Sequence, residues 1–219
     1  MDTEDNFIEM TLNNEFQFAE KDKPTEIILS ANLKAPFFED ENRAPVDIVA
    51  VVDVSGSMRS HIHLVKDTLN FMIKELGSQD SFSIVTFSND AHTLLPLRRM
   101  DDEGTSLAAN KIKGLSAAGG TFLSGGLFQG LYEALSRDGE MNDVCSVLLF
   151  TDGKANRGIK DTTSIVNILS DPRLLENEIK NLKNNKKSIN QYAYTIYTFG
   201  YGQRHDAEAG PEVRQQPGS

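Results

Sequence analysis

The chain has 219 residues and a formal net charge of −10, and 39% of its residues are hydrophobic, which is ordinary for a soluble globular protein. This length suffices for one domain with a substantial core. The excess of acidic residues argues against a nucleic-acid partner, because binding phosphates requires clustered lysine and arginine. The sequence has no run of about 18 apolar residues, so we expect no membrane span.

Targeting features and cysteine usage favour the cytosol. The first five residues are acidic and lack the basic and apolar regions of a secretory signal. Cys145 is the only cysteine, so no disulfide can form within the chain. The sequence also has no Asn-x-Ser/Thr acceptor for glycosylation. We therefore expect a cytoplasmic protein, although a segment of a secreted protein would show the same features.

The first 44 residues differ from the rest. Residues 7–18 and 26–34 are β-like stretches with no helical pattern between them, and a polar segment follows. We predict an N-terminal β appendage and linker over residues 1–44. The appendage should form a strand or hairpin outside the main sheet, as part of a sandwich completed by further sequence.

From residue 46 onward, strand patterns alternate with helical patterns. Short apolar runs typical of strands buried on both faces occupy residues 46–52, 82–87, 144–150 and 193–199. Residues 92–97 follow a Ser-Asn-Asp turn and predict an edge strand in a hairpin.

Helical spacing of apolar residues fills the intervals between these strands. The positions that carry it are Ile62, Val65, Leu69, Met72, Ile73, Leu76, Leu107, Ile112, Leu115, Leu127, Leu131 and Leu135. Gly77 is a natural stop for the first helix, and Pro172 interrupts a mostly helical segment over residues 165–187. Parallel strands need such crossover helices, so we predict a doubly wound, mostly parallel α/β sheet with helices on both faces and a Rossmann-like topology.

Hydroxyl and carboxylate side chains follow two of the predicted strands. The segment DVSGS, residues 53–57, comes directly after the first strand, and Asp152 follows the third. Thr121 lies in a Gly-Gly-Thr turn before another helix. The carboxyl ends of parallel strands form the ligand crevice of such sheets, so these groups should meet at one edge. The predicted set is Asp53, Ser55, Ser57, Thr121 and Asp152.

The chemistry of this set selects a hard cation. All five side chains offer oxygen, and none is a histidine or a thiolate, which favours magnesium, calcium or manganese over zinc or copper. Two carboxylates roughly neutralise a divalent ion. Magnesium prefers a partly hydrated octahedron with oxygens at about 2.0–2.1 Å, which leaves one position for an outside oxygen. We therefore predict a Mg²⁺ site, with Mn²⁺ or Ca²⁺ as alternatives, that faces an Asp or Glu carboxylate of a protein partner.

These residues carry a resemblance to a known family. DVSGS, GGT with Thr121 and TDG with Asp152 resemble the three loops of the metal-ion-dependent adhesion site (MIDAS) of von Willebrand factor type A (VWA) domains. The likeness extends through VDIVAVVDVSGSM, SIVTFSNDAHTLLPL, GGTFLSGGL, LLFTDG and YTFGYG, in family order, over residues 45–203. It implies that Asp53, Ser55, Ser57, Thr121 and Asp152 are the metal-site positions, none of them substituted.

The resemblance also implies ligand binding rather than turnover, so we expect no enzyme activity. The chain is more similar to the intracellular or RING-finger-associated members and to the inter-alpha-trypsin-inhibitor heavy chains than to integrin inserted domains. Members usually continue past the YTFGYG strand with another helix and strand. Residues 204–219 contain Pro211 and Pro217 and few apolar side chains, so we expect an irregular tail without them.

Other interpretations of the motif stay open. Ser57 or Ser60 could cap the following helix instead of binding a metal. A magnesium-dependent phosphohydrolase could also place an aspartate such as Asp53 after its first strand. The haloacid dehalogenase type, however, needs a second aspartate where this chain has Ser55. A scaffold that has lost its metal would show a substituted ligand, and none of the five positions is substituted. A binding module is therefore the best interpretation.

Overall fold

The computed structural model describes residues 9–14, 29–34, 43–137, 142–153, 155–182 and 193–202. The chain forms two compact units, Met1–Arg43 and Ala44–Ser219.

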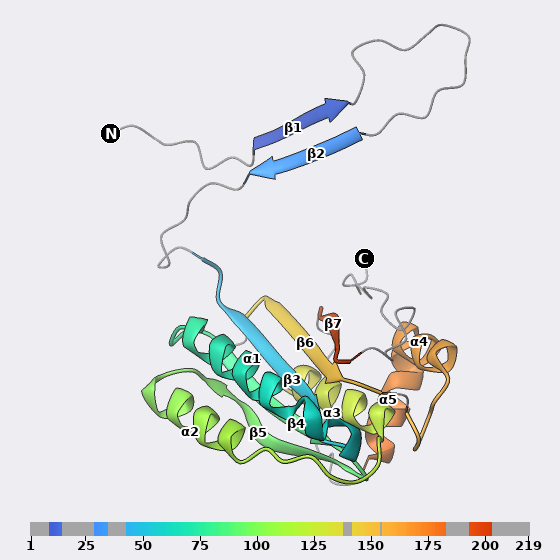
Figure 1. Ribbon diagram of the computed structural model, residues 1–219. Helices are drawn as coiled ribbons and strands as arrows, with labels where there is room; N and C mark the ends of the chain where they lie inside the picture. Colours follow the sequence, from blue (N-terminus) through green and yellow to red (C-terminus); the bar gives the residue numbers. More distant parts are fainter. Residues whose placement is uncertain are drawn as a thin grey trace, which may run out of the picture. The chain divides into compact units, whose positions relative to one another are not determined.

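The first unit contains an antiparallel hairpin in which β1 (Glu9–Asn14) pairs with β2 (Leu29–Lys34) (Figure 1). Strand alternation and the pairing register put Met10, Leu12 and Leu33 on one face, and all three are exposed. The predicted β hairpin outside the main sheet is confirmed at these strands. The remainder of the two predicted β-like stretches lies outside the described residues.

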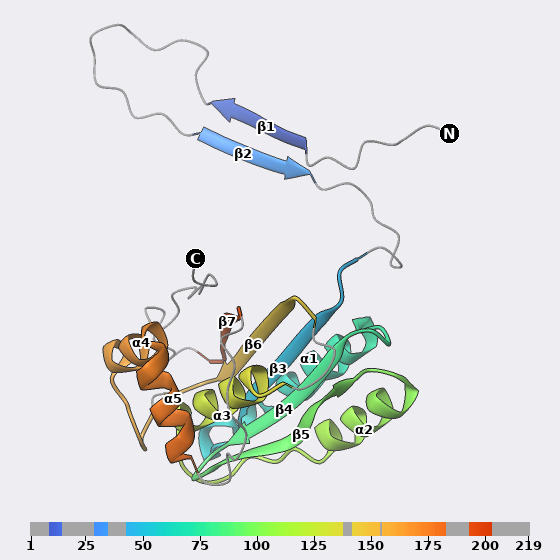
Figure 2. The same cartoon turned by 180° about the vertical axis from the view of Figure 1, so that it is seen from behind.

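The second unit is built on a five-stranded sheet in the order β5-β4-β3-β6-β7 (Figures 1 and 2). The strands are β3 (Val46–Asp53), β4 (Ser81–Phe87), β5 (Ala91–Arg99), β6 (Val144–Thr151) and β7 (Thr195–Gly200). β5 runs antiparallel to β4, and every other pairing in this sheet is parallel. The predicted mostly parallel sheet with an antiparallel edge strand is confirmed.

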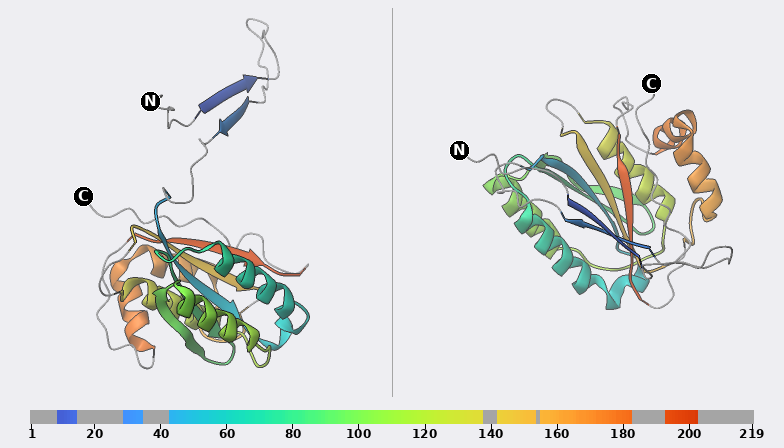
Figure 3. Two further views of the ribbon diagram at one scale, coloured as in Figure 1. Left: turned by 90° about the vertical axis from the view of Figure 1, so that its left-hand side faces the viewer. Right: turned by 90° about the horizontal axis from the view of Figure 1, so that it is seen from above.

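In the described residues, five α-helices connect the strands and cover both faces of the sheet (Figure 3). They are α1 (Ile62–Glu75), α2 (Asp102–Lys113), α3 (Leu123–Leu135), α4 (Thr162–Ser170) and α5 (Pro172–Asn181), with a short 3₁₀ turn, η2 (Gly56–Ser60), before α1. The break at Pro172 is confirmed, because Asp171 accepts a hydrogen bond from the Arg173 amide and caps α5. Within the described ranges, no helix is long and apolar enough to span a bilayer.

The core divides into two apolar clusters, one on each face of the sheet. Residues of β3 alternate between them: Val49 and Val51 pack with α3 and α5, whereas Ala50 and Val52 pack with α1 and α2. This strand is therefore buried on both faces, as its β-branched sequence predicts.

Side chains of β7 alternate between the two faces of the sheet. Ile196 and the preceding Tyr194 are buried against the cluster that contains α5. Tyr197 and Phe199 point to the other face and are 43% and 44% exposed, and Phe199 stacks on Phe150 of β6. The predicted tail, residues 204–219, lies outside the described residues.

Helix α3 lies directly against the sheet because two of its glycines face the strands. A Cβ atom at Gly126 would lie 2.3 Å from the Phe87 ring, and one at Gly130 would lie 2.3 Å from the Val51 side chain. Both distances are far shorter than a van der Waals contact, so only glycine permits this approach. The close packing also fixes the start of the helix into which the turn with Thr121 leads.

We predict that Gly130→Ala lowers the free energy of unfolding by about 1–3 kcal/mol, because the added methyl group overpacks the contact with Val51. Urea unfolding followed by circular dichroism measures the change. Gly114→Ala is the matched control, since its Cβ would find its nearest neighbour at 3.5 Å and its φ is −77°. A Gly130 variant as stable as the Gly114 control would contradict the tight contact.

Candidate metal site

The turn between β3 and η2 contributes three of the predicted side chains. Asp53 is the last residue of β3 and is fully buried, and Ser55 is 1% exposed. The Ser55 amide donates a hydrogen bond of 2.8 Å to Asp53 Oδ1, which fixes the carboxylate inside the turn. The hydroxyl oxygens of Ser55 and Ser57 lie 3.0 Å apart.

The loop after β6 adds the second carboxylate. Because Val52 pairs with Phe150, β3 and β6 end at the same edge of the sheet. The Ser57 hydroxyl donates to Asp152 Oδ1 at 2.8 Å, and the Thr151 hydroxyl donates to Asp53 Oδ2 at 2.7 Å. The structure thus links Asp53, Ser55, Ser57 and Asp152 into one hydrogen-bonded group.

The loop that carries Thr121 lies against the β3 turn. The Gly56 amide donates to the Gly119 carbonyl at 3.0 Å, and the Ala118 amide donates to the Val54 carbonyl at 2.8 Å. Gly119 has a φ of +88°, a conformation that strongly favours glycine. Thr121 itself is buried, at 5% exposure, at the same edge of the sheet.

The hydroxyls of this site do not cap helices. Ser55 precedes η2 and makes no side-chain capping bond, and the residue that precedes α1 is His61, which makes none either. The Ser57 hydroxyl instead points to Asp152. The helix-capping interpretation of these serines is therefore not supported, and their oxygens face one another across the turn.

The electrostatics of Asp53 contrast with those of Asp47, a second buried aspartate on the same strand. Asp47 forms an ion pair with the buried Arg137, and its Oδ1 accepts a hydrogen bond of 2.9 Å from the side-chain Nδ2 of Asn142. In the described part of the chain, no lysine or arginine forms an ion pair with Asp53 or Asp152.

Burial is the main influence on the titration of Asp53. Burial raises its pKa above the ordinary value, and the nearby charge of Asp152 raises it further, while hydrogen bonds from Ser55 and Thr151 lower it only in part. An added cation would remove this electrostatic cost.

The donor set is poor in classical metal ligands. Among the described residues, no group of three His, Cys, Asp or Glu side chains is placed to hold a metal ion. A site made of two carboxylates and three hydroxyls fits that result and suits only a hard cation.

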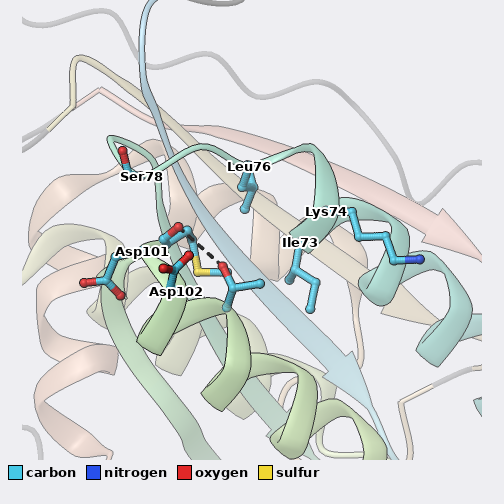
Figure 4. Close-up of a pocket in the computed structure, with 8 residues that line it drawn as sticks. Ile73, Lys74, Leu76, Ser78, Asp101 and Asp102 are labelled. Carbon is cyan, nitrogen blue, oxygen red and sulfur yellow. Dashed lines mark hydrogen bonds between the residues drawn. The ribbon is translucent and has the colours of Figure 1, made fainter.

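The described chain also has a hollow of about 460 Å³ between the end of α1 and the start of α2 (Figure 4). Ile73, Leu76 and Met100 form its apolar part, and Asp101 and Asp102 lie at the start of α2. Because α1 begins beside the β3 turn and ends here, this hollow lies at the opposite edge of the sheet from the predicted ligands. It contains none of them.

Sequence reasoning missed three residues that support the site: Thr151, Asn89 and Asn156. Thr151 bonds Asp53, while Asn89 and Asn156 accept hydrogen bonds from the Gly120 and Thr121 amides. Thr151 is the last residue of β6, and Asn89 and Asn156 lie in loops that follow strands at the carboxyl edge. This position after a strand is the only feature of the sequence that could have indicated them.

An open, mostly parallel sheet with helices on both faces and with these hydroxyl and carboxylate residues at its carboxyl edge is a doubly wound α/β architecture. The model of the von Willebrand factor type A domain family matches residues 47–218. The chain therefore belongs to the VWA family.

Two curated relatives match different shares of the chain. The chain is 37% identical to the E3 ubiquitin-protein ligase WAV3 of Arabidopsis thaliana over 118 residues, which cover 53% of this chain and 16% of that protein. It is 28% identical to inter-alpha-trypsin inhibitor heavy chain H1 of Mesocricetus auratus over 213 residues, which cover 90% of this chain and 21% of that protein. In both cases the chain corresponds to only a small part of the relative.

Solved structures support the fold. A von Willebrand factor type A protein from Catenulispora acidiphila superposes with a TM-score of 0.53 at 18% identity, covering 95% of this chain and 44% of that one. Proximal thread matrix protein 1 from the mussel byssus gives a TM-score of 0.51 at 20% identity, covering 73% and 39%. Both likenesses show the architecture alone.

We predict that Asp53→Asn raises the unfolding free energy of the metal-free chain at pH 7, because it removes a buried, unpaired charge at constant size. A raised pKa means that the folded chain holds the Asp53 proton more tightly than the unfolded chain. The resulting stability is present at low pH and is lost as the pH rises through the folded pKa. The advantage of the variant should therefore shrink on acidification from pH 7 toward pH 4.

Urea unfolding in EDTA across this pH range measures the effect. Asp67→Asn, on an exposed position of α1, is the control and should differ little from wild type at any pH. A difference between Asp53→Asn and wild type that does not vary with pH would refute the electrostatic explanation.

Proposed function

We propose that this VWA domain is a metal-dependent protein-binding module. One Mg²⁺ ion, with Mn²⁺ or Ca²⁺ as alternatives, would be held by Asp53, Ser55, Ser57, Thr121 and Asp152. VWA domains act in protein–protein interaction, and this part of the assignment follows from family membership. The observation that carries the metal proposal is the buried Asp53 carboxylate, which lacks a cationic partner among the described residues and stands beside a second carboxylate.

The burial of the proposed ligands supports a site that is shielded from solvent on its inner side and accessible to solvent on its outer side. Asp53 and Ser55 are buried beneath the turn, whereas Asp152 is half-buried and Ser57 is exposed. An ion held from within by the buried oxygens would keep its outer side accessible to another molecule. The chemistry it supplies there is a positive centre for an incoming oxygen.

The charge of the chain explains why a partner carboxylate would depend on the ion. With a net charge of −10 and two carboxylates in the site, the protein alone repels an acidic group. A bound divalent cation would offset the two carboxylates and offer a positive centre to an incoming oxygen. We therefore propose that the partner is a protein that binds through an Asp or Glu side chain.

An enzymatic role is the weaker alternative. A phosphohydrolase of the haloacid dehalogenase type would need an acidic side chain at position 55, where the buried Ser55 hydroxyl lies beside Ser57. The ligase activity named for the Arabidopsis relative describes a protein of which this chain matches 16%. We propose that the domain itself binds and does not catalyse.

We expect Mg²⁺ or Mn²⁺ to raise the melting temperature of the chain. At a metal concentration 100 times the Kd, binding adds about 2.7 kcal/mol to stability, or roughly 5–10 °C for a domain of this size. Differential scanning fluorimetry with and without EDTA measures the shift. Asp152→Ala should keep the fold and abolish the shift, whereas Asp67→Ala, which removes an exposed aspartate of α1, should retain it. An undiminished shift in Asp152→Ala would defeat the assignment.

Partner binding should share this dependence. Immobilised wild-type chain is expected to capture protein partners from a lysate in Mg²⁺ and to release them in EDTA, while Asp152→Ala captures none of them. In any partner identified in this way, each Glu of the contact surface can be changed to Gln and each Asp to Asn, one at a time. One of these substitutions should abolish binding to the chain. Capture that persists unchanged in EDTA would contradict a metal-mediated contact.

A further inference from the structure

Two asparagine side chains hold the loop that carries Thr121. The Gly120 amide donates to Asn89 Oδ1 at 2.9 Å, and the Thr121 amide donates to Asn156 Oδ1 at 2.9 Å. Asn89 follows β4 and Asn156 follows β6, so the loop is tied to the ends of two different strands. Neither asparagine belongs to the five predicted ligands.

Asn156 also donates a hydrogen bond to Thr121. The backbone amide of Asn156 donates to the Thr121 carbonyl at 3.1 Å, and the backbone amide of Arg157 donates to the same carbonyl at 3.3 Å. Both backbone polar groups of Thr121 are therefore bonded to the loop after β6. That loop also carries Asp152, so one set of hydrogen bonds fixes the Thr121 turn relative to a carboxylate of the candidate site.

Arg157 and Gly120 complete this arrangement. Arg157 Nη1 donates to Asn89 Oδ1 at 3.2 Å, which connects the two asparagine contacts. A Cβ atom at Gly120 would lie 3.0 Å from the side-chain oxygens of both Asn89 and Asn156. Glycine at this position lets both amide oxygens approach the loop.

We propose that Asn156, with Asn89, is a positioning residue of the metal site, which holds the Thr121 hydroxyl at a fixed place relative to Asp152. This inference rests on the proposed metal function. An asparagine oxygen suits the task because it accepts the Thr121 amide without placing a third negative charge beside Asp53 and Asp152.

A residue that positions a metal ligand affects metal selectivity, whereas a residue that only stabilises the fold does not. Mg²⁺ demands a nearly ideal octahedron, whereas Ca²⁺ accepts variable geometry and coordination number. Loosening the Thr121 turn should therefore weaken Mg²⁺ binding more than Ca²⁺ binding. Loss of a group that orients a metal ligand typically weakens affinity about 10–100-fold.

The experiment is calorimetric titration of the 219-residue chain with Mg²⁺ and, separately, Ca²⁺, at a temperature where circular dichroism shows each variant to be folded. We expect Asn156→Ala to bind Mg²⁺ about 10–100-fold more weakly than wild type, with a smaller loss for Ca²⁺. Asn110→Ala, on the exposed side of α2, is the matched control and should bind both ions as wild type does. Should Asn156→Ala not fold, Asn89→Ala tests the other half of the contact by the same criterion.

The possible outcomes separate this inference from the proposed function. If wild type binds Mg²⁺ and Asn156→Ala binds it equally well, the positioning role is wrong while the metal site stands. Equal losses for Mg²⁺ and Ca²⁺ would also overturn it, because they would show a general structural effect. If wild type binds neither ion, the proposed function fails, and the positioning role fails with it.

Discussion

The parallel register between β3 and β6 is the constraint on which the candidate site depends. Val52 pairs with Phe150, so Asp53 and Thr151 leave adjacent strands side by side, and Asp152 follows within reach of Ser57. A shift of one residue would move one carboxylate by about 3.3 Å along the strand and turn its side chain to the other face. The two apolar clusters prevent that shift, because β3 alternates between them.

Each end of β3 carries a buried aspartate, and only one of the two forms an ion pair with a basic side chain of the described residues. At the start, Asp47 is neutralised by Arg137, and Asn142 bonds it as well, so this end is electrostatically complete without a ligand. At the carboxyl end, Asp53 faces only hydroxyl and amide donors among the described residues, and burial raises its pKa. Breaking a buried ion pair is costly, whereas a carboxylate left without one is a place where an added cation stabilises the fold.

The site is assembled from turns rather than from the interior of helices or strands, and its geometry therefore depends on what holds the turns. Gly56 bonds Gly119, which fixes the Thr121 loop to the β3 turn. Helix α3, which follows that loop, is anchored close to the sheet by Gly126 and Gly130. Rigid strands and a tightly packed helix thus give precise positions to side chains that lie on loops.

The sequence by itself determined the elements and the donor set, because both depend on local signals. Apolar periodicity located the strands and helices, Pro172 located the break between α4 and α5, and the Ser-Asn-Asp turn indicated the antiparallel edge strand. The DVSGS segment with Thr121 and Asp152 indicated the ligands. The presence of metal at this site stays a prediction of that pattern.

Only the tertiary structure decided which distant groups meet. Arg137 reaches Asp47 across 90 positions, and Asn156 reaches Thr121 across 35. It also showed that the Ser57 hydroxyl bonds Asp152 instead of capping a helix. These contacts follow from strand order and register, which are set by the packing of residues far apart in the chain and leave no local trace in the sequence.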